Sequence, residues 1–398
     1  MPEERFAPSP PTNRGALAAD IAHRRTELAK TMAGEAIDAL VVASEANALY
    51  LTGYETTFWG NKSKPFVVIF APPQKPLVIC HVGESVSVNL DAIDVDVEPY
   101  GGPELTHVST GVQLDYQLPC VDAVTSALIR LGIERAGLEL SWHFIPGFTP
   151  MAMEQLRGRF SGDVVDASAA IWSARRVKSD WEVGQMRRAG AINDAAHVEF
   201  ASRARIGDTE RELGRLLRMC AYQAGAERVG YSGIIAGIER APLGGPTDRR
   251  WERGQLLFVD LCLQVNGYFA DFNRVYASET PTEDQARAYA DVVDALAIGR
   301  RLANPAHTVA ELADAMIGEA EAPYARVGHG LGLEMPEPPS ISPLDQASLV
   351  PGEVLCLEPN REIRGVGWMV SEETVLISDR GPELLSPPFP EHLAVIGG

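Results

Sequence analysis

The first part of the chain alternates between helical and strand-like hydrophobic patterns. Residues 15–33 have apolar positions at helical spacing, and residues 37–43 (IDALVVA) form a short β-branched run that is typical of a buried strand. The same patterns predict further strands at 66–70, 77–82, 93–97 and 136–140, and a helix at 121–131. Strands and helices that alternate in this way predict an α/β domain.

The pattern changes in residues 167–183 (ASAAIWSARRVKSDWEV), which contain a basic cluster and then Ser179. Ser179 followed by Glu182 is the signature of a capping box, so a long helix is predicted from there to about residue 204. The patterns then predict helices at 209–224, 283–303 and 309–319, and strands at 230–235, 256–265 and between 328 and 377. We therefore predict an α/β domain over residues 1–170 and an α+β domain over residues 171–398.

Composition narrows the class of protein. The chain has 398 residues, 45% of them apolar and 22% charged, which is typical of a globular protein with two domains. A formal net charge of −19 without a basic patch argues against binding to nucleic acid. No apolar run reaches the roughly 18 residues of a membrane span, and the N-terminal stretch lacks an apolar leader segment. The five cysteines show no paired spacing, so we expect buried thiols, a cytoplasmic location and no membrane partner.

Two aspartates, Asp260 and Asp271, lie in an apolar, strand-like stretch, LLFVDLCLQVNGYFADFNRVY. The turn-prone dipeptide of Asn266 and Gly267 predicts a hairpin there. If this hairpin is centred between Val265 and Asn266, the two aspartates are directly opposed. Opposed Cβ atoms are about 5 Å apart, so the two carboxylates would repel each other.

A second acidic pair, Glu358 and Glu372, is equidistant from Gly365 in a similar stretch. We predict another hairpin there, which would again place two carboxylates face to face. Opposed acids in apolar strands are unfavourable unless they are protonated or share a cation. A bound divalent metal is the simplest remedy.

Between the two pairs lies VGHGLGLEMPEPP, in which glycines flank His329 and allow backbone and imidazole to approach a centre closely. One neutral nitrogen and four carboxylates form a hard ligand set that suits Mn, Fe or Co, with Zn also possible. Each feature alone is common, because the chain has 54 acidic residues and a histidine beside glycines is usually a packing residue. Their order along the chain is the informative observation.

This order resembles the pita-bread metalloenzymes, the family of creatinase, prolidase and aminopeptidase P. The matching motifs are GYxxDxxR at residues 267–274, the GHGxG histidine, the EP pair of Glu358 and Pro359, and the E-E/D-T-V segment at residues 372–375. The resemblance extends to RRVKSDWEVGQMRRA and to EANALYLTGY, which is similar to the creatinase-type N-terminal domain. It implies a creatinase-like N-terminal domain followed by a pita-bread catalytic domain.

The resemblance also implies five ligands for two divalent metal ions. By the family pattern, Asp260 chelates one ion, whereas Asp271 and Glu372 bridge both. His329 and Glu358 complete the second site and are the candidate catalytic residues, with Glu358 moving protons. Paired ions would supply a nucleophile and a Lewis acid for hydrolysis.

Two histidines of the peptidase members are replaced in this chain. Gly244 stands where a histidine precedes the first aspartate, and Pro336 stands in the GHGxGxxxHE motif. Those imidazoles orient the substrate in Xaa-Pro cleavage, so their absence bears on substrate more than on metal. Glu337, its neighbour Glu334, and Arg240 are candidate substrate-binding groups, although each is also an ordinary loop residue.

Trp59 is a further candidate for substrate binding. With Phe58 and Lys62 it belongs to the segment TTFWGNK, which resembles a creatinase loop that reaches the active site of a partner subunit. An ordinary turn of the N-terminal domain is the competing interpretation. The resemblance also implies a homodimer.

We therefore predict a two-metal hydrolase that cuts an amide or related C–N bond in a Xaa-Pro-like dipeptide or a small zwitterionic substrate. Open alternatives are a lyase of the same fold, similar to dimethylsulfoniopropionate lyase, and an amidohydrolase similar to ectoine hydrolase or creatinase. A non-catalytic binding module is disfavoured, because all the ligand positions are retained.

Overall fold

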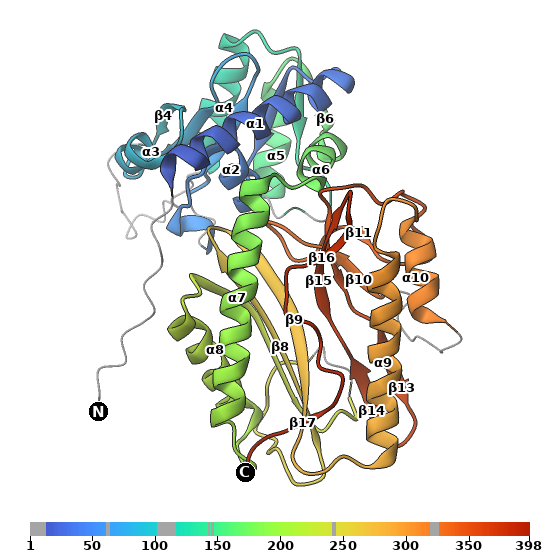
Figure 1. The fold of residues 1–398 in the computed structure, drawn as a ribbon. Helices are drawn as coiled ribbons and strands as arrows, with labels where there is room; N and C mark the ends of the chain where they lie inside the picture. Colours follow the sequence, from blue (N-terminus) through green and yellow to red (C-terminus); the bar gives the residue numbers. More distant parts are fainter. Residues whose placement is uncertain are drawn as a thin grey trace, which may run out of the picture. The chain divides into compact units, whose positions relative to one another are not determined.

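The chain divides into two compact units (Figure 1), of which one ends at Arg175 and the other contains Arg176–Gly398. The structure, a computed structural model, describes residues 13–60, 64–101, 117–141, 144, 147–240, 244–318 and 326–398. The predicted domain limit between residues 170 and 171 falls inside helix α6 (Ser168–Arg176).

The N-terminal unit is built on a six-stranded mixed sheet with the order β4-β3-β2-β1-β5-β6. β1 pairs antiparallel with β2 and parallel with β5, and the outer strands β4 and β6 run parallel to their neighbours. The strands are β1 (Ala39–Val42), β2 (Val67–Phe70), β3 (Leu77–His81), β4 (Asp96–Tyr100), β5 (Arg135–Leu138) and β6 (Asp163–Asp166).

Both faces of this sheet are buried. All of β1 is buried, with Leu40 and Val42 in the apolar cluster on one face and Ala39 and Val41 in the cluster on the other. A strand that is apolar on both sides needs a covering layer on each face. The helices are α1 (Arg14–Gly34), α2 (Glu45–Thr52), α3 (Ser85–Asp91), α4 (Gln117–Arg130), α5 (Pro150–Arg159) and α6, with a short 3-10 turn η1 (Thr57–Gly60). The predicted α/β domain is confirmed.

One predicted strand of this unit is displaced. The pattern indicated a strand at residues 93–97, but β4 begins at Asp96. Helix α3 ends just before Ala92, and the chain then turns at Asp94, whose φ is 46°. Ile93 is buried at this turn but does not belong to β4. Its β-branched side chain therefore made the predicted strand begin too early.

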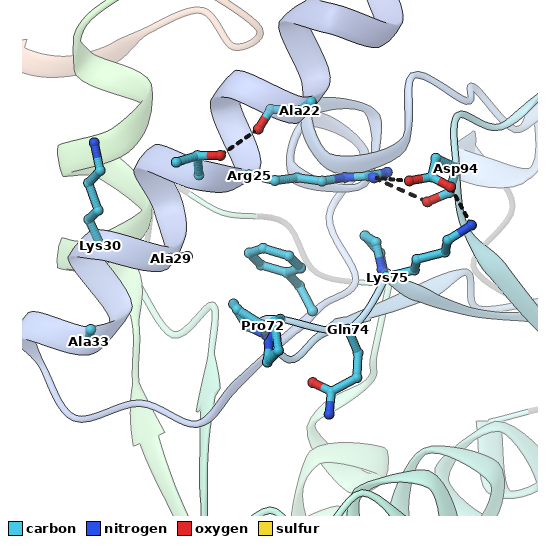
Figure 2. A pocket seen from close by; sticks show the side chains of 13 residues that line it. Ala22, Arg25, Ala29, Lys30, Ala33, Pro72, Gln74, Lys75 and Asp94 are labelled. Carbon is cyan, nitrogen blue, oxygen red and sulfur yellow. Dashed lines mark hydrogen bonds and ion pairs between the residues drawn. The ribbon is translucent and has the colours of Figure 1, made fainter.

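A surface hollow of about 580 Å³ lies between α1 and the β2–β3 turn (Figure 2). The cations that line it are engaged with the protein. Arg25 donates to backbone carbonyls, including that of Asp94, and Lys75 Nζ lies 2.5 Å from Asp94 Oδ1. Lys30 pairs with Glu27 at 2.7 Å. The hollow therefore presents charge that is already neutralised.

The C-terminal unit contains two larger sheets and a separate hairpin. The first sheet has the order β17-β9-β8-β7 and the second β11-β10-β12-β15-β16. Their strands are β7 (Arg228–Ala236), β8 (Leu256–Val265), β9 (Tyr268–Ala277), β10 (Gly328–Gly330), β11 (Glu337–Ser340), β12 (Val354–Leu357), β15 (Glu373–Ser378), β16 (Gly381–Leu384) and β17 (Ala394–Val395). The hairpin consists of β13 (Asn360–Ile363) and β14 (Gly367–Val370).

Two pairs of helices accompany these sheets. Figure 1 shows the green helices α7 (Asp180–Arg203) and α8 (Glu210–Ala224) beside β8 and β9, and the orange helices α9 (Glu283–Leu302) and α10 (Val309–Ile317) beside the second sheet. The predicted capping box is present at α7, where Ser179 accepts from the Glu182 amide and the Glu182 carboxylate accepts from the Ser179 amide. Among the residues that the structure describes, none of the helices combines the length and the apolar character needed to cross a bilayer.

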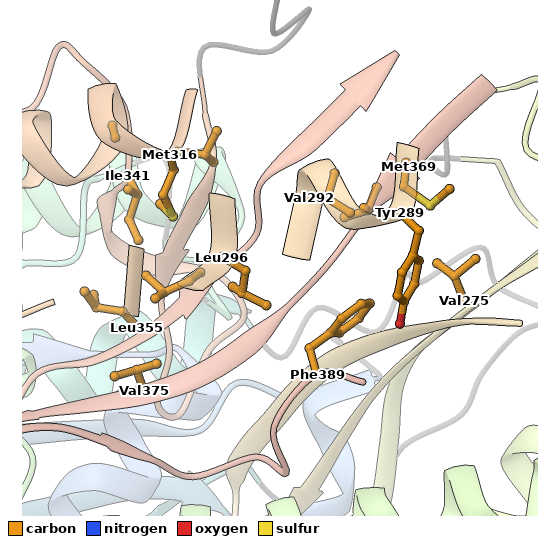
Figure 3. Packing of buried hydrophobic residues seen from close by; sticks show 14 of the residues in the cluster. Val275, Tyr289, Val292, Leu296, Met316, Ile341, Leu355, Met369, Val375 and Phe389 are labelled. Atoms are coloured by element: carbon orange, nitrogen blue, oxygen red, sulfur yellow. The ribbon is translucent and has the colours of Figure 1, made fainter. Parts of the chain in front are cut away.

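Each helix pair closes its own apolar core. One core joins α7 and α8 to β7–β9, through residues such as Phe200, Leu217 and Leu261. The other joins α9 and α10 to the second sheet and the β13–β14 hairpin (Figure 3), where Leu296 and Leu355 are among the packed residues. Helix pairs packed on largely antiparallel sheets confirm the predicted α+β domain.

Candidate metal centre

The first acidic pair lies on the β8–β9 hairpin, with a register that differs from the prediction. Asn266 and Gly267 both have positive φ, 49° and 81°, and form the two-residue turn themselves. The hairpin is therefore centred one residue later than predicted, between Asn266 and Gly267. Asp260 faces Asn273, and Asp271 faces Cys262. The prediction of direct opposition is wrong: the aspartates are diagonal neighbours on the same face of the ladder.

The second acidic pair agrees with its predicted register. Leu357 pairs with Glu373 at the end of the β12–β15 ladder, and Asn360 pairs with Val370 at the start of the β13–β14 ladder. Both ladders are centred on the same residue, Gly365. The positions of Glu358 and Glu372 between the two ladders are therefore opposite one another, as predicted.

His329 lies on β10, between two glycines that are tightly enclosed. A Cβ atom at Gly328 would lie 2.1 Å from the carbonyl oxygen of Cys356, and one at Gly330 would lie 2.3 Å from that of Pro338. Any side chain at either position would displace the strand. The glycines thus let the backbone of β10 pack closely against its neighbouring strands, and the predicted approach to a metal centre stays a prediction.

The hydrogen bonds of the imidazole define which of its nitrogens is free to bind a cation. His329 Nδ1 lies 2.8 Å from the Gly330 carbonyl oxygen, which can only accept, so Nδ1 carries the proton. Nε2 then presents a lone pair, and it lies 3.6 Å from Asp271 Oδ2. When Asp271 is ionised, two acceptors face each other across this gap. Burial lowers the pKa of His329 to about 4, so the ring is neutral near pH 7.

Four potential ligand atoms lie within 4.8 Å of one another, and they come from the buried residues Asp271, His329, Cys356 and Glu372. Burial, and then the charge of Asp260, raise the pKa of Asp271 well above its usual range. Burial, and then the charge of Asp271, raise the pKa of Glu372 in the same direction. Carboxylates in this position are unstable as bare anions.

The other two acids, Asp260 and Glu358, are partly exposed. Desolvation raises the pKa of each, and Glu358 contributes further to the raised pKa of Asp260. Asp260 Oδ1 has no hydrogen-bond partner among the described residues. The same is true of both amide atoms of Asn273, which is fully buried opposite Asp260.

These surroundings fit a divalent cation. A neutral imidazole nitrogen and several carboxylates converge, and Asp260 Oδ1 has no hydrogen-bond partner among the described residues. A cation between Nε2 and the carboxylates would be bound by the nitrogen lone pair and the carboxylate oxygens and would remove the repulsion between them.

Two residues near the centre were not singled out from the sequence. A Cβ atom at Gly233, which faces Asp260 across the β7–β8 ladder, would lie 2.8 Å from the hydroxyl of Tyr231. This hydroxyl therefore lies next to Asp260, and burial followed by the charges of the four acids raises its pKa. Arg326 is the cation whose charge lowers the pKa values of Asp271 and Glu358.

The candidate substrate group Glu337 is held by its own surroundings. Its Oε2 lies 2.9 Å from Lys178 Nζ, and its Oε1 accepts from the amides of Leu333 and Glu334 at 2.9 and 3.2 Å. Both partners of the ion pair are buried. These contacts fix the loop between β10 and β11, which follows His329.

Arg240 makes a two-oxygen contact with Glu210, at 2.5 and 2.6 Å from Nη2. Its side chain is 31% exposed, so the guanidinium keeps a solvent-facing side. A Cβ atom at Gly244 would lie 2.8 Å from Arg240 Nη1. The guanidinium therefore lies directly over the position where the family histidine is missing.

Trp59 belongs to the N-terminal unit, where it is largely buried and packs edge-on against Phe66 with ring centroids 5.7 Å apart. The described side chain is thus part of the core around Phe66. Lys62 and the side chain of Phe58 lie outside the described residues.

Comparisons with known proteins agree with this architecture. Residues 184–379 match the family model described as metallopeptidase family M24, and residues 24–177 match the creatinase/prolidase N-terminal domain. The two models meet close to the limit between the two compact units.

Individual relatives are similar over most of the chain. A Xaa-Pro dipeptidase of Pyrococcus horikoshii is 27% identical over 88% of this chain and 93% of its own length. A Xaa-Pro dipeptidase of Pyrococcus furiosus is 32% identical over 54% of this chain, and the match spans 64% of that relative. The crystal structure of an X-Pro aminopeptidase from Thermotoga maritima has a TM-score of 0.78, with 22% identity over 94% of this chain and 99% of that one.

The structural similarity confirms the fold, and the family models cover both units with the predicted domain types. The chain belongs to the pita-bread metalloenzymes, as a member of metallopeptidase family M24 with a creatinase/prolidase-type N-terminal domain.

Proposed function

We propose that this protein is a metal-dependent hydrolase that cleaves the amide bond of a Xaa-Pro-like dipeptide or a similar small zwitterion. The observation that carries the proposal is the pair of acceptors, His329 Nε2 and Asp271 Oδ2, that face each other at 3.6 Å inside a ring of buried acids. Membership of a metallopeptidase family and the Xaa-Pro dipeptidase relatives support the reaction class.

We propose that up to two divalent ions, of the Mn, Fe or Co class, are held by Asp260, Asp271, His329, Glu358 and Glu372. Bound there, they would polarise the scissile carbonyl and make water a nucleophile near neutral pH. Support comes from the raised pKa values of the four acids and from the unpartnered Oδ1 of Asp260.

Glu358 is the proposed proton carrier. Desolvation raises its pKa towards the range in which a carboxyl group can both accept and return a proton. Glu358 is partly exposed, as is Asp260, and we call the side of the centre that holds these two acids its open side. A substrate is proposed to enter from this side. His329, neutral and oriented by the Gly330 carbonyl, keeps Nε2 directed at the centre.

Substrate orientation is proposed to involve Arg240 and Tyr231, in place of the imidazoles missing at Gly244 and Pro336. Arg240 covers Gly244 and offers a cation for a substrate carboxylate, although it also serves Glu210. The Tyr231 hydroxyl beside Asp260 can donate to a carbonyl or an oxyanion. A direct substrate contact by Glu337 has less support, because Lys178 and two loop amides surround its oxygens.

The second candidate function is a small-molecule amidohydrolase of the ectoine hydrolase or creatinase type. It is favoured by one observation, the replacement of both substrate-orienting histidines by Gly244 and Pro336. The lyase alternative gains no comparable support from the comparisons described above, in which the named proteins are peptidases.

A metal-reconstituted activity screen tests the proposal. The panel contains Xaa-Pro dipeptides, creatine, ectoine-like cyclic amidines and sulfonium zwitterions, with Asp271→Asn protein as the matched negative control. Metal-dependent release of proline from a dipeptide is the expected result. Hydrolysis confined to creatine or the amidines would select the second candidate. Elimination from the sulfonium compounds without any hydrolysis would overturn both.

We also propose a cytoplasmic location and a homodimer. Support for a reducing compartment comes from the cysteines, all five of which are buried and form no disulfide. The homodimer is proposed on the resemblance to creatinase alone, and sedimentation of the purified protein would test it.

A further inference from the structure

The buried side of the centre contains a sulfur atom beside the oxygens and the nitrogen. Cys356 is fully buried on β12, where it pairs with His329 on one side and with Thr374 on the other. It points to the same face of its strand as Glu358, two residues later, because side chains alternate along a strand. Its Sγ is one of the four ligand atoms that lie within 4.8 Å of one another.

The thiol is only weakly committed to other partners. Cys356 Sγ is 3.7 Å from the carbonyl oxygen of Asp271 and 3.7 Å from Thr374 Oγ1. That carbonyl already accepts a shorter bond, 2.8 Å, from the Thr374 hydroxyl. The thiol can therefore turn away without leaving the carbonyl unsatisfied.

The spacing of the four atoms is close to what a shared cation requires. Ligands at about 2.0 to 2.3 Å around a tetrahedral ion are roughly 3.4 to 3.8 Å apart. Separations of at most 4.8 Å reach this range with shifts of about an ångström. The lone pair of His329 Nε2, aimed at Asp271 Oδ2, independently indicates a cation at this place.

We propose that Cys356 is a sulfur ligand of the cation on the buried side of the centre, together with Asp271, His329 and Glu372. The inference rests on the metal centre of the proposed function and specifies its chemistry. As the sulfur–metal bond forms, the thiol proton leaves to solvent, and no electron is transferred. Binding at this position therefore favours thiophilic divalent ions such as Zn²⁺, Co²⁺ and Cd²⁺ over Mn²⁺.

Cys262 provides a matched control. It is also fully buried and faces Asp271 directly across the β8–β9 ladder. Its thiol is outside the set of four mutually close ligand atoms. Cys262→Ser replaces a thiol by a hydroxyl two residues from Asp260, just as Cys356→Ser does two residues from Glu358. It leaves the proposed sulfur donor in place.

The test is the absorption spectrum of the full-length protein loaded with Co²⁺. The wild type and Cys262→Ser are expected to show a sulfur-to-cobalt charge-transfer band in the near ultraviolet, and Cys356→Ser to lack it. Titration should show that Cys356→Ser lowers Cd²⁺ affinity about 10- to 100-fold and Mn²⁺ affinity by less than about threefold.

Visible cobalt bands without a charge-transfer band in the wild type would overturn the sulfur ligand and leave the metal centre intact. Retention of the band in Cys356→Ser, or its loss in Cys262→Ser, would also overturn the assignment. A wild type that binds no cobalt would overturn this inference and the proposed function together. If Cys356→Ser fails to fold, X-ray absorption of the zinc-loaded wild type decides, since a sulfur neighbour at about 2.3 Å is required.

Discussion

The two sides of the acidic centre contain the same residue types in different surroundings. Asp271 and Glu372 are buried, whereas Asp260 and Glu358 are partly exposed. Each hairpin contributes one acid to each side. The buried side also contains His329, so it collects the groups that we propose bind a cation, whereas the two acids of the open side are partly exposed and are proposed to meet substrate and protons.

The difference arises from what lies across each ladder. Asp260 faces a glycine on one neighbouring strand, Gly233, and the space beside that glycine is taken by the Tyr231 hydroxyl. Asp271 has a buried thiol, Cys262, opposite it and lies next to His329. Equal charges therefore have unequal accessibility, and we expect unequal effects when they are changed one at a time.

The largest expected effect is the loss of metal in Asp271→Asn. This change keeps the shape and removes the charge that faces His329 Nε2, so metal affinity should fall more than about 100-fold, and activity with it. Asp260→Asn, on the open side, should lower affinity by about tenfold and the stoichiometry by at most one ion. Calorimetric titration with Mn²⁺ measures both.

The control for this pair is Asp284→Asn, at an aspartate whose side chain is 72% exposed at the start of α9. It should leave the binding isotherm unchanged. Equal losses in Asp271→Asn and Asp260→Asn would show that the two sides do not differ in the way proposed.

Glu358→Gln should separate catalysis from metal binding. The amide keeps one oxygen for the cation but cannot carry a proton, so kcat should fall about 10²- to 10⁴-fold. Metal content, measured on the same preparation, should fall far less than in Asp271→Asn. Loss of all bound metal from Glu358→Gln would place this residue with the buried side.

Metal affinity should rise with pH. The raised pKa values of the four acids mean that the metal-free folded state holds protons that the unfolded chain releases above about pH 4. The metal-free protein should therefore lose stability as the pH rises from there, and added cations should restore it.

A cation must displace the same protons, so its affinity should increase about tenfold per pH unit for each proton displaced. Titrations between about pH 5 and pH 8 measure this slope. A flat profile would mean that the acids are already ionised without metal, contrary to the directions of their pKa shifts.

The sequence predicted the two domain types and the order of the acids, because hydrophobic periodicity and motif spacing are local properties. The register of the Glu358–Glu372 pair was also predictable, since its hairpin is symmetric about Gly365. The Asp260–Asp271 register was not, because Asn266 and Gly267 both occupy the turn and shift the ladder.

Other parts of the site depend on three-dimensional packing. Cys356 could have been suspected from its spacing of two residues before Glu358, which places both on one strand face. The position of Tyr231 depends on a register shift between Val229 and Tyr231 in the β7–β8 ladder. No periodic signal marks such a bulge in the sequence.

The smallest expected effect comes from Tyr231→Phe, on the open side. The substitution removes only the hydroxyl, which lies where a side chain at Gly233 would be and therefore next to Asp260. A neutral hydrogen bond contributes about 0.5 to 1.5 kcal/mol, so kcat/KM should fall about two- to tenfold. Metal affinity should stay within about twofold of the wild type, because the phenol is proposed to donate a hydrogen bond to substrate and not to bind the metal.

Tyr222→Phe, at a tyrosine that is 40% exposed on α8, is the matched control and should leave kcat/KM unchanged. The comparison is decisive in either direction. A drop in metal affinity with unchanged kcat/KM in the metal-saturated Tyr231→Phe protein would move Tyr231 to the metal-holding side. A fall in kcat/KM with unchanged metal affinity would assign the hydroxyl to substrate binding. That result would also support the division between a buried side that binds cations and an open side that recognises the substrate.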